Sequence, residues 1–274
     1  MHIKVQELVN SHDRTNALKR RQLLGPKKIG ANMTTLIVGA SGATGRLLVE
    51  ELLNRGQAVK IIVRSLDSLP ETVKGHINLS VIQVSILDMS DADMVRQVQG
   101  CHAVVSCLGH NMTFRGLFGR PRRLVTDATR RLCDAIRATD PSEPVKFVLM
   151  NTTGNRNRDL DERISFGQKC VIGLLRLLLP PHVDNEKAAD YLRSDVGQND
   201  PQIEWAAVRP DGLVDEFDVT DYKVFVSPIR SAIFNSGTTS RINVAHFIAK
   251  LVNADSTWNK WRGKMPVIYN ATST

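Results

Sequence analysis

A glycine-rich segment, GASGATGR at residues 39–46, separates a short apolar run from an amphipathic one. The β-branched run at 34–40 predicts a buried strand, and residues 43–55 place leucines at helical spacing. Where a strand turns sharply into a helix through glycines, the free N–H groups and the dipole of the helix N-terminus favour a phosphate. This context predicts a βα unit that binds a dinucleotide.

Each glycine of the segment has an expected task. Gly39 would allow the tight turn, Gly42 the approach of the backbone to a pyrophosphate, and Gly45 the close packing of helix on strand. The hydroxyl groups of Ser41 and Thr44 could add hydrogen-bond donors. The alternative is a tight turn that binds no ligand.

The end of the second predicted strand bears on which dinucleotide binds. An NAD site usually has an acidic residue there, whereas this chain has Arg64 followed by Ser65, and Arg46 comes just after the first turn. A guanidinium can hold a 2′-phosphate with two hydrogen bonds. We therefore expect NADP(H) as the preferred cofactor and leave NAD(H) open, the alternative being that Arg64 is a solvated surface side chain.

Strand and helix patterns alternate from residue 33 onward. Almost continuously apolar strands indicate a parallel sheet that is covered by helices on both faces. We predict an α/β fold, a Rossmann-type doubly wound parallel sheet, as a single domain over 33–274 with a C-terminal substrate-side portion. Strands are predicted at 34–40, 58–63, 79–84, 103–108, 145–150, 203–208, 224–226 and 266–269, and helices at 43–55, 90–98, 122–138, 166–179, 184–196 and 243–252.

Residues 1–32 differ from the rest of the chain. They carry seven Lys or Arg against two Asp or Glu, and so hold most of the net charge of +8. We predict a flexible basic extension, with an organelle-targeting leader or a translated upstream extension as alternatives. No nucleic-acid reader motif accompanies the charge, so we expect no nucleic-acid partner.

The four cysteines form no CxxC pair, so we expect no metal site. Cys101 and Cys107 adjoin apolar runs and are expected in the core, where free cysteine is often found. Reduced thiols fit an intracellular compartment. The sequence contains no run of eighteen apolar residues, so we predict no membrane-spanning helix. We expect a cytoplasmic protein, with organelle targeting by the N-terminal extension left open.

Four motifs in order resemble those of atypical short-chain dehydrogenases/reductases, in the branch of NmrA-like proteins and biliverdin/flavin reductases. They are GASGATGR, VRS at 63–65, AVVSCLG at 103–109 and EWAAVRPDGL at 204–213, and the resemblance spans about residues 34–214. It implies that strand 103–108 runs under the cofactor, that Thr152 takes the place of an active-site serine or threonine, and that 209–213 lies near the nicotinamide. The expected cofactor-binding residues are Gly39, Ser41, Gly42, Ala43, Thr44, Gly45, Arg46, Arg64, Ser65, Ser85, Cys107, Leu108 and Gly109.

The sequence departs from that family pattern in two places. Ser85 stands after the third strand, where relatives often carry an adenine-contacting aspartate. The tyrosine–lysine pair of many short-chain dehydrogenases is also missing. Lys187 falls where the lysine is expected, but Val183 precedes it by four residues, and Tyr191 is expected to pack in the helix. Lys187 is either close to the cofactor or merely exposed.

Two further segments could contact a ligand. FRGLFGRPRR at 114–123 could face an acidic substrate such as a phosphorylated flavin, the alternative being a solvated loop with Pro121 in the first helical turn. The apolar segment 166–181 is expected to be buried, with a lid, a dimer face or an interfacial membrane contact as alternatives.

The leading hypothesis is an NADP(H)-dependent oxidoreductase that acts on a small-molecule substrate. Its candidate catalytic residues are Thr152, whose hydroxyl could orient a carbonyl or merely cap a turn, and Lys187. Because the tyrosine–lysine pair is missing, a non-catalytic NADP(H) sensor with a protein partner is the alternative. A chaperone-like role that uses only the surface of the fold is a third.

Overall fold

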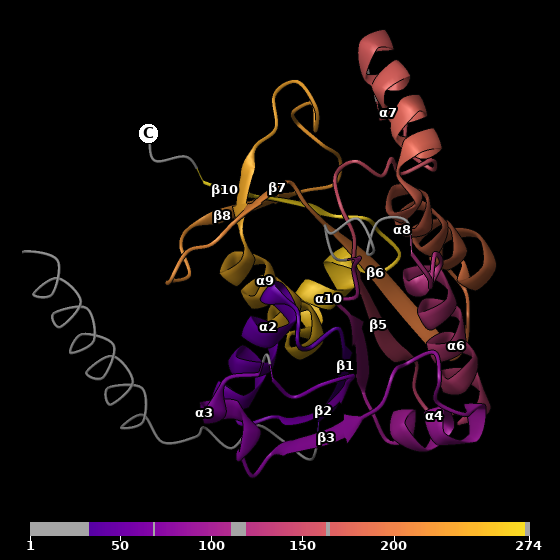
Figure 1. Ribbon diagram of the computed structural model, residues 1–274, viewed down its shortest axis with the longest axis vertical. Coiled ribbons are helices and arrows are strands. Elements are labelled where there is room, and N and C mark those ends of the chain that lie inside the picture. The colour runs from indigo at the N-terminus through magenta and orange to yellow at the C-terminus, as the bar shows by residue number, and fades with distance from the viewer. Residues whose placement is uncertain (1–32, 68, 111–118, 163–164, 272–274) are drawn as a thin grey trace, which may run out of the picture. The chain divides into compact units, whose positions relative to one another are not determined.

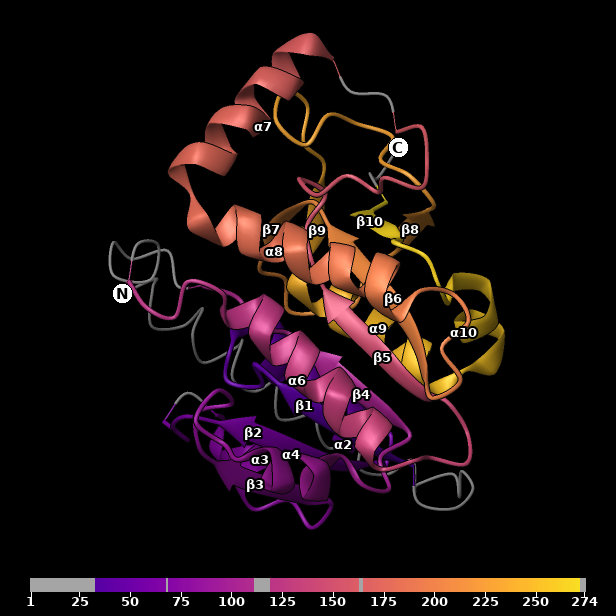
Figure 2. The same ribbon diagram turned by 90° about the vertical axis from the view of Figure 1, so that its right-hand side faces the viewer.

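The computed structural model describes residues 33–67, 69–110, 119–162 and 165–271, and they form an eight-stranded sheet with helices on both faces (Figures 1 and 2). The strand order is β3-β2-β1-β4-β5-β6-β10-β8, and every neighbouring pair is parallel except β10 and β8. This arrangement confirms the predicted Rossmann-type sheet. The strands are β1 (Thr34–Val38), β2 (Ala58–Val63), β3 (Leu79–Gln83), β4 (Ala103–Ser106), β5 (Val145–Met150), β6 (Ile203–Pro210), β8 (Tyr222–Phe225) and β10 (Val267–Asn270).

Two helical layers bury the sheet. Successive side chains of β1 point to opposite faces, since Leu36 and Val38 pack in one apolar cluster and Ile37 in the other. The layers are α4 (Asp91–Val98), α6 (Leu124–Ala138) and α8 (Pro180–Tyr191) on one face, and α2 (Ala43–Asn54), α9 (Arg241–Asn253) and α10 (Asp255–Trp261) on the other. Helix α7 (Phe166–Leu178) projects beyond the sheet in both views, and Phe166 and Leu177 are exposed on it. The apolar segment is therefore less buried than predicted.

The carboxyl ends of the central strands meet at one edge of the sheet. Val38 of β1 pairs with Ile62 of β2 on one side and with Ser106 of β4 on the other, and Ser106 pairs with Leu149 of β5. The segments that follow these four strands therefore leave the sheet side by side. In α/β folds of this kind, ligands bind outside this edge.

Two helix starts differ from the prediction, each for its own reason. The side chain of Asp184 is buried, and its carboxylate accepts hydrogen bonds from the N–H groups of Val125 and Thr126, at 2.8 and 3.0 Å. It therefore caps α6, which begins at Leu124, so Pro121 lies outside the first helical turn. Helix α8 begins earlier than predicted, with prolines in its first turn. Proline has no N–H group, and the N–H groups of a first helical turn have no partner within the helix, so proline is well tolerated there.

Several short elements were not predicted. The helical segment at 184–196 ends as a π-helical turn, Leu192–Val196, after α8. The others are α3 (Glu71–Lys74), α10, and a small parallel sheet of β7 (Gly212–Val214) and β9 (Thr238–Ser240). Among the described helices, none combines the length and apolarity that a membrane crossing requires.

Candidate functional site

The glycine-rich turn packs tightly against the end of β4. Gly39 has a φ of +76°, and a Cβ there would lie 2.5 Å from the carbonyl carbon of Cys107. A Cβ on Gly45 would lie 2.1 Å from the carbonyl oxygen of Gly39. Both positions therefore require glycine, and the backbone of Cys107 lies beside the turn.

The start of α2 has the features of a phosphate site. Gly42 is the N-cap, no side chain caps the first turn, and both Gly42 and Ala43 are exposed. A Cβ on Gly42 would meet the Gly39 carbonyl oxygen at 3.2 Å, so the backbone itself tolerates a side chain there better than at the other two glycines. Ser41 is half-buried, whereas Thr44 is buried. An open helix N-terminus of this kind fits the pyrophosphate of a dinucleotide.

The ends of β2 and β3 continue the same edge of the sheet. Arg64 is exposed, and no hydrogen bond or ion pair joins it to another described residue. The Ser65 hydroxyl donates to the Asp67 carboxylate at 2.6 Å and accepts from the Asp67 N–H at 3.1 Å. Ser85 follows β3 and is half-buried. Arg64 is thus available to an anionic ligand, while Ser65 shapes the turn beside it.

Thr152 follows β5, next to β4. Its Oγ1 accepts a hydrogen bond from the N–H of Gly154 at 3.3 Å, so it does cap a turn, yet its own O–H remains available to donate. The side chain of Asn151 donates to the carbonyl oxygen of Asn185 at 3.0 Å and thereby ties this turn to α8. Thr152 is half-buried at the edge that also carries the glycine-rich turn.

The two α8 residues named by the sequence have different surroundings. Lys187 is exposed, as expected of either a cofactor-proximal or a solvated lysine. Tyr191 is buried, and its hydroxyl accepts a hydrogen bond from Arg137 of α6 at 3.2 Å. Burial raises the pKa of Tyr191 above its ordinary value. Tyr191 therefore belongs to the packing between helices and not to a catalytic pair.

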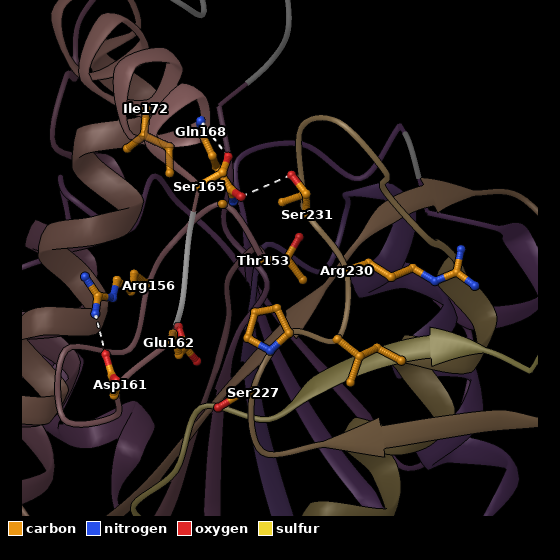
Figure 3. A pocket seen from close by; sticks show the side chains of 14 residues that line it. Thr153, Arg156, Asp161, Glu162, Ser165, Gln168, Ile172, Ser227, Arg230 and Ser231 are labelled. Atoms are coloured by element: carbon orange, nitrogen blue, oxygen red, sulfur yellow. Dashed lines mark hydrogen bonds and ion pairs between the residues drawn. The ribbon is translucent and has the colours of Figure 1, made fainter.

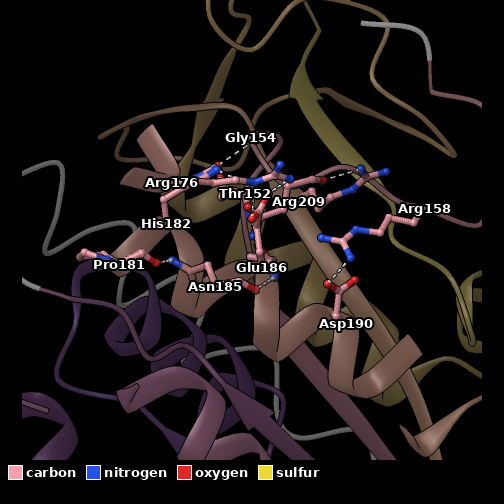
Figure 4. Close-up of polar contacts among 12 residues, drawn as sticks. Thr152, Gly154, Arg158, Arg176, Pro181, His182, Asn185, Glu186, Asp190 and Arg209 are labelled. Carbon is pink, nitrogen blue, oxygen red and sulfur yellow. Dashed lines mark hydrogen bonds and ion pairs between the residues drawn. The ribbon is translucent and has the colours of Figure 1, made fainter. Parts of the chain in front are cut away.

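A histidine and a glutamate near Thr152 were not singled out from the sequence (Figure 4). The Nε2 atom of His182 lies 3.5 Å from a carboxylate oxygen of Glu186, and Arg176 of α7 donates to both oxygens, at 2.8 and 2.9 Å. Burial alone would raise the pKa of Glu186, but the neighbouring imidazole of His182 and the hydrogen bonds from Arg176 lower it to about 2. The i, i+4 spacing of His182 and Glu186 was visible in the sequence, whereas the approach of α7 was not.

The 209–213 segment forms part of the internal framework. Arg209 is fully buried, and Asp211 accepts hydrogen bonds from the Thr153 hydroxyl at 3.0 Å and the Gly237 N–H at 2.8 Å. Beside these contacts lies a cavity of about 430 Å³, which is lined by Thr153, by the start of α7 and by residues 227–232 (Figure 3). In it, the Ser231 hydroxyl donates to Gln168 at 3.1 Å. The cavity adjoins the turn that carries Thr152.

Other expected features fall partly outside the described residues. This holds for residues 114–118 of the arginine-rich segment 114–123 and for the whole extension 1–32. Arg123, which is described, is exposed and lies 3.3 Å from Asp127. Among the described residues, no cluster of His, Cys, Asp or Glu is arranged to hold a metal ion. The four cysteines are free thiols, with Cys101 buried and Cys107 half-buried.

Comparison with known proteins identifies the family. The model of the NAD(P)H-binding family matches residues 39–255, from the glycine-rich turn to the start of α10. The chain belongs to this family. No curated protein matches it. The resemblance to atypical short-chain dehydrogenases/reductases is thereby confirmed at the level of an NAD(P)H-binding fold.

Solved structures of other family-like proteins share the fold. An oxidoreductase from Lactococcus lactis, ylbE, is 18% identical with a TM-score of 0.62, over 88% of this chain and 93% of its own. A short-chain dehydrogenase/reductase from Veillonella parvula in complex with NADP is 14% identical with a TM-score of 0.63, over 88% and 96%. ChuY, an anaerobillin reductase from Escherichia coli O157:H7, is 17% identical with a TM-score of 0.61, over 88% and 99%. At these identities the likeness establishes the fold.

Proposed function

We propose that this NAD(P)H-binding protein is an NADP(H)-dependent oxidoreductase that acts on a small-molecule substrate beside Thr152. The observation that carries the proposal is one sheet edge that holds an uncapped helix N-terminus, the Thr152 hydroxyl and Arg64, which is exposed and pairs with no described residue. The family and a structural neighbour in complex with NADP support a nicotinamide cofactor.

The residues of this edge would divide the binding of the dinucleotide between them. The backbone of 41–45 would hold the pyrophosphate, Arg64 the 2′-phosphate, and 107–109 the middle of the cofactor. Ser65, Arg46 and Ser85 would complete its adenosine side. The bound nicotinamide would supply or accept a hydride, while the protein binds and orients the substrate.

Thr152 is proposed to orient the substrate. Its hydroxyl would donate a hydrogen bond to a substrate carbonyl oxygen, because its acceptor side is already used by the Gly154 N–H. Exposed on α8, Lys187 would stand on the cofactor side of the site. The cavity that begins at Thr153 offers room for a small molecule next to this hydroxyl.

A second candidate function is a non-catalytic NADP(H) sensor that reports to a protein partner. Two observations favour it: Val183 lies four residues before Lys187, and the hydroxyl of Tyr191 is engaged by Arg137. No described tyrosine thus occupies the position of a tyrosine–lysine pair.

The two functions are separated by turnover. The purified chain is incubated with NADPH and a panel of flavins, quinones and small carbonyl compounds, and NADPH oxidation is followed by absorbance. The oxidoreductase predicts turnover with at least one compound, and a Thr152→Ala variant that loses about 100-fold in kcat while Thr152→Ser keeps most of it and NADPH affinity is unchanged. Tight and equal binding of NADP and NADPH without turnover would instead support the sensor.

A further inference from the structure

A second cavity, of about 370 Å³, lies between α7, α8 and the loop after β5. It shares Gly154, Arg156 and Ile172 with the larger cavity, so the two adjoin each other. We call it the basic groove. Its lining residues are Gly154, Arg156, Arg158, Lys169, Ile172, Arg176 and Glu186, all in the described part of the chain.

Four cationic side chains and one carboxylate line the basic groove, so the groove carries a net positive charge. Arg158 lies 3.1 Å from Asp190 (Figure 4), but Arg156 is only within 3.8 Å of Asp161, whose side chain is 89% exposed. Lys169 is exposed and makes no ion pair with a described residue. A solvated carboxylate at that distance neutralises a guanidinium poorly. Arg156 and Lys169 are therefore free to meet an anion.

Arg176 is held in place for the same task. Its Nε and Nη2 atoms donate to the two oxygens of Glu186, at 2.8 and 2.9 Å, which fixes the plane of the guanidinium. The N–H groups of Nη1 have no acceptor among the described residues and remain available. The buried Ile172 adds an apolar surface between the cations.

The groove also lies beside the turn of Thr152. Gly154, whose N–H bonds to Thr152 Oγ1, lines the groove, and a Cβ on Gly154 would lie 3.5 Å from His182. A ligand whose charged end lies among Arg156, Lys169 and Arg176 would thus have its uncharged part next to the Thr152 hydroxyl.

We propose that the basic groove binds the carboxylate or phosphate group of the substrate, which is therefore a small organic acid. That the bound acid is a substrate rests on the proposed oxidoreductase function, whereas anion binding at the groove does not. Arg156, Lys169 and Arg176 supply the charge, and the reacting carbonyl of the acid lies at Thr152. These residues are separate from the arginine-rich segment 114–123.

The test is calorimetric titration of the full chain at low salt, with and without saturating NADPH. The probes are succinate, inorganic phosphate and, as the uncharged control, succinamide. We expect succinate or phosphate to bind and succinamide not to bind. The anion that binds more tightly shows whether the groove takes a carboxylate or a phosphate. Lys169→Gln and Arg156→Gln should each weaken binding by about tenfold, since each removes a charge-assisted hydrogen bond. Lys223→Gln, an exposed cation on β8, should leave it unchanged.

The outcomes separate this inference from the proposed function. Anion affinity that is equal in wild type and both groove variants, with unchanged thermal unfolding midpoints, overturns the groove as the site. Absence of anion binding in a sample that binds NADPH overturns the inference and leaves the dinucleotide proposal standing. Anion binding that depends on Lys169 in a sample that fails to bind NADPH keeps the groove and overturns the oxidoreductase.

Discussion

The guanidinium of Arg209 and the carboxylate of Glu162 form a two-pronged ion pair inside the protein, with N–O distances of 2.7 and 3.0 Å. Both side chains are almost fully buried, at 0% and 4% exposed. Glu162 also accepts from the N–H of Asn157 at 2.8 Å, and Arg209 donates to the carbonyl oxygen of Asn155 at 2.9 Å. The pair thus fastens the loop that carries Arg156 and Arg158 to strand β6.

Glu162→Gln should strongly destabilise the fold. It leaves the buried Arg209 without a compensating charge, and breaking such a pair costs about 3–5 kcal/mol. The free energy of unfolding in urea measures the effect. Glu71→Gln is the matched control, because its pair with Lys74 spans 2.7 Å but Glu71 is 86% exposed, and such pairs contribute at most about 1 kcal/mol. Equal losses in the two variants would contradict the structural role of Arg209.

The glycine-rich turn allows binding and folding to be separated. Gly45→Ala places a methyl group on the Gly39 carbonyl oxygen and should lower the thermal unfolding midpoint clearly. Gly42→Ala should keep most of the stability, because its Cβ would lie 3.2 Å from that oxygen. It should nevertheless weaken the binding of the dinucleotide, because the methyl group blocks the approach of the pyrophosphate. Gly75→Ala, where a Cβ meets nothing within 4 Å, controls for the substitution itself. If Gly42→Ala bound NADPH as tightly as the wild type, the assignment of the phosphate site would be wrong.

Much of the sheet could be predicted because local pattern and tertiary role agree there. Strands β2 and β5 have the predicted bounds, since runs such as VKFVLM at 145–150 must be buried on both faces. The start of α6 could not be predicted, because its cap comes from Asp184, some sixty residues later in the chain. The short α3, β7 and β9 carry too few residues for a periodic pattern.

Glu186 should contribute stability that depends on acid pH. Its folded pKa of about 2 lies below the ordinary value of 4.5, so the ionised form is favoured by folding. The contribution is complete above about pH 4.5 and is lost as the pH falls towards 2. The difference in unfolding midpoint between wild type and Glu186→Gln should therefore shrink between pH 5 and pH 2, roughly the range set by the two pKa values. A difference that stays constant with pH would show that the pairing with Arg176 and His182 does not stabilise the fold.

As with the fold, one part of the candidate site could be predicted from the sequence and another part could not. The glycine-rich turn, Arg64 and Thr152 could be located because each directly follows a predictable strand, and parallel strands end at one edge. The basic groove could not, because α7 reaches it only through contacts such as that of Arg176 with Glu186. Arg209 was assigned to the nicotinamide by resemblance, and only its hydrogen bonds to Asn155 and Glu162 show that it holds a loop.

We propose that the edge formed by the glycine-rich turn and Arg64 binds NADP(H). Calorimetric titration of the purified chain with NADPH, NADP and NADH, in wild type, in Arg64→Ala and in the control Arg96→Ala on α4, tests it most directly. We predict that NADPH binds at least about tenfold more tightly than NADH, a gap of about 1.4 kcal/mol, and that only Arg64→Ala removes the preference. Equal affinity for NADPH and NADH in the wild type would contradict the assignment of Arg64. Failure of all three dinucleotides to bind the folded protein would contradict dinucleotide binding at this edge altogether.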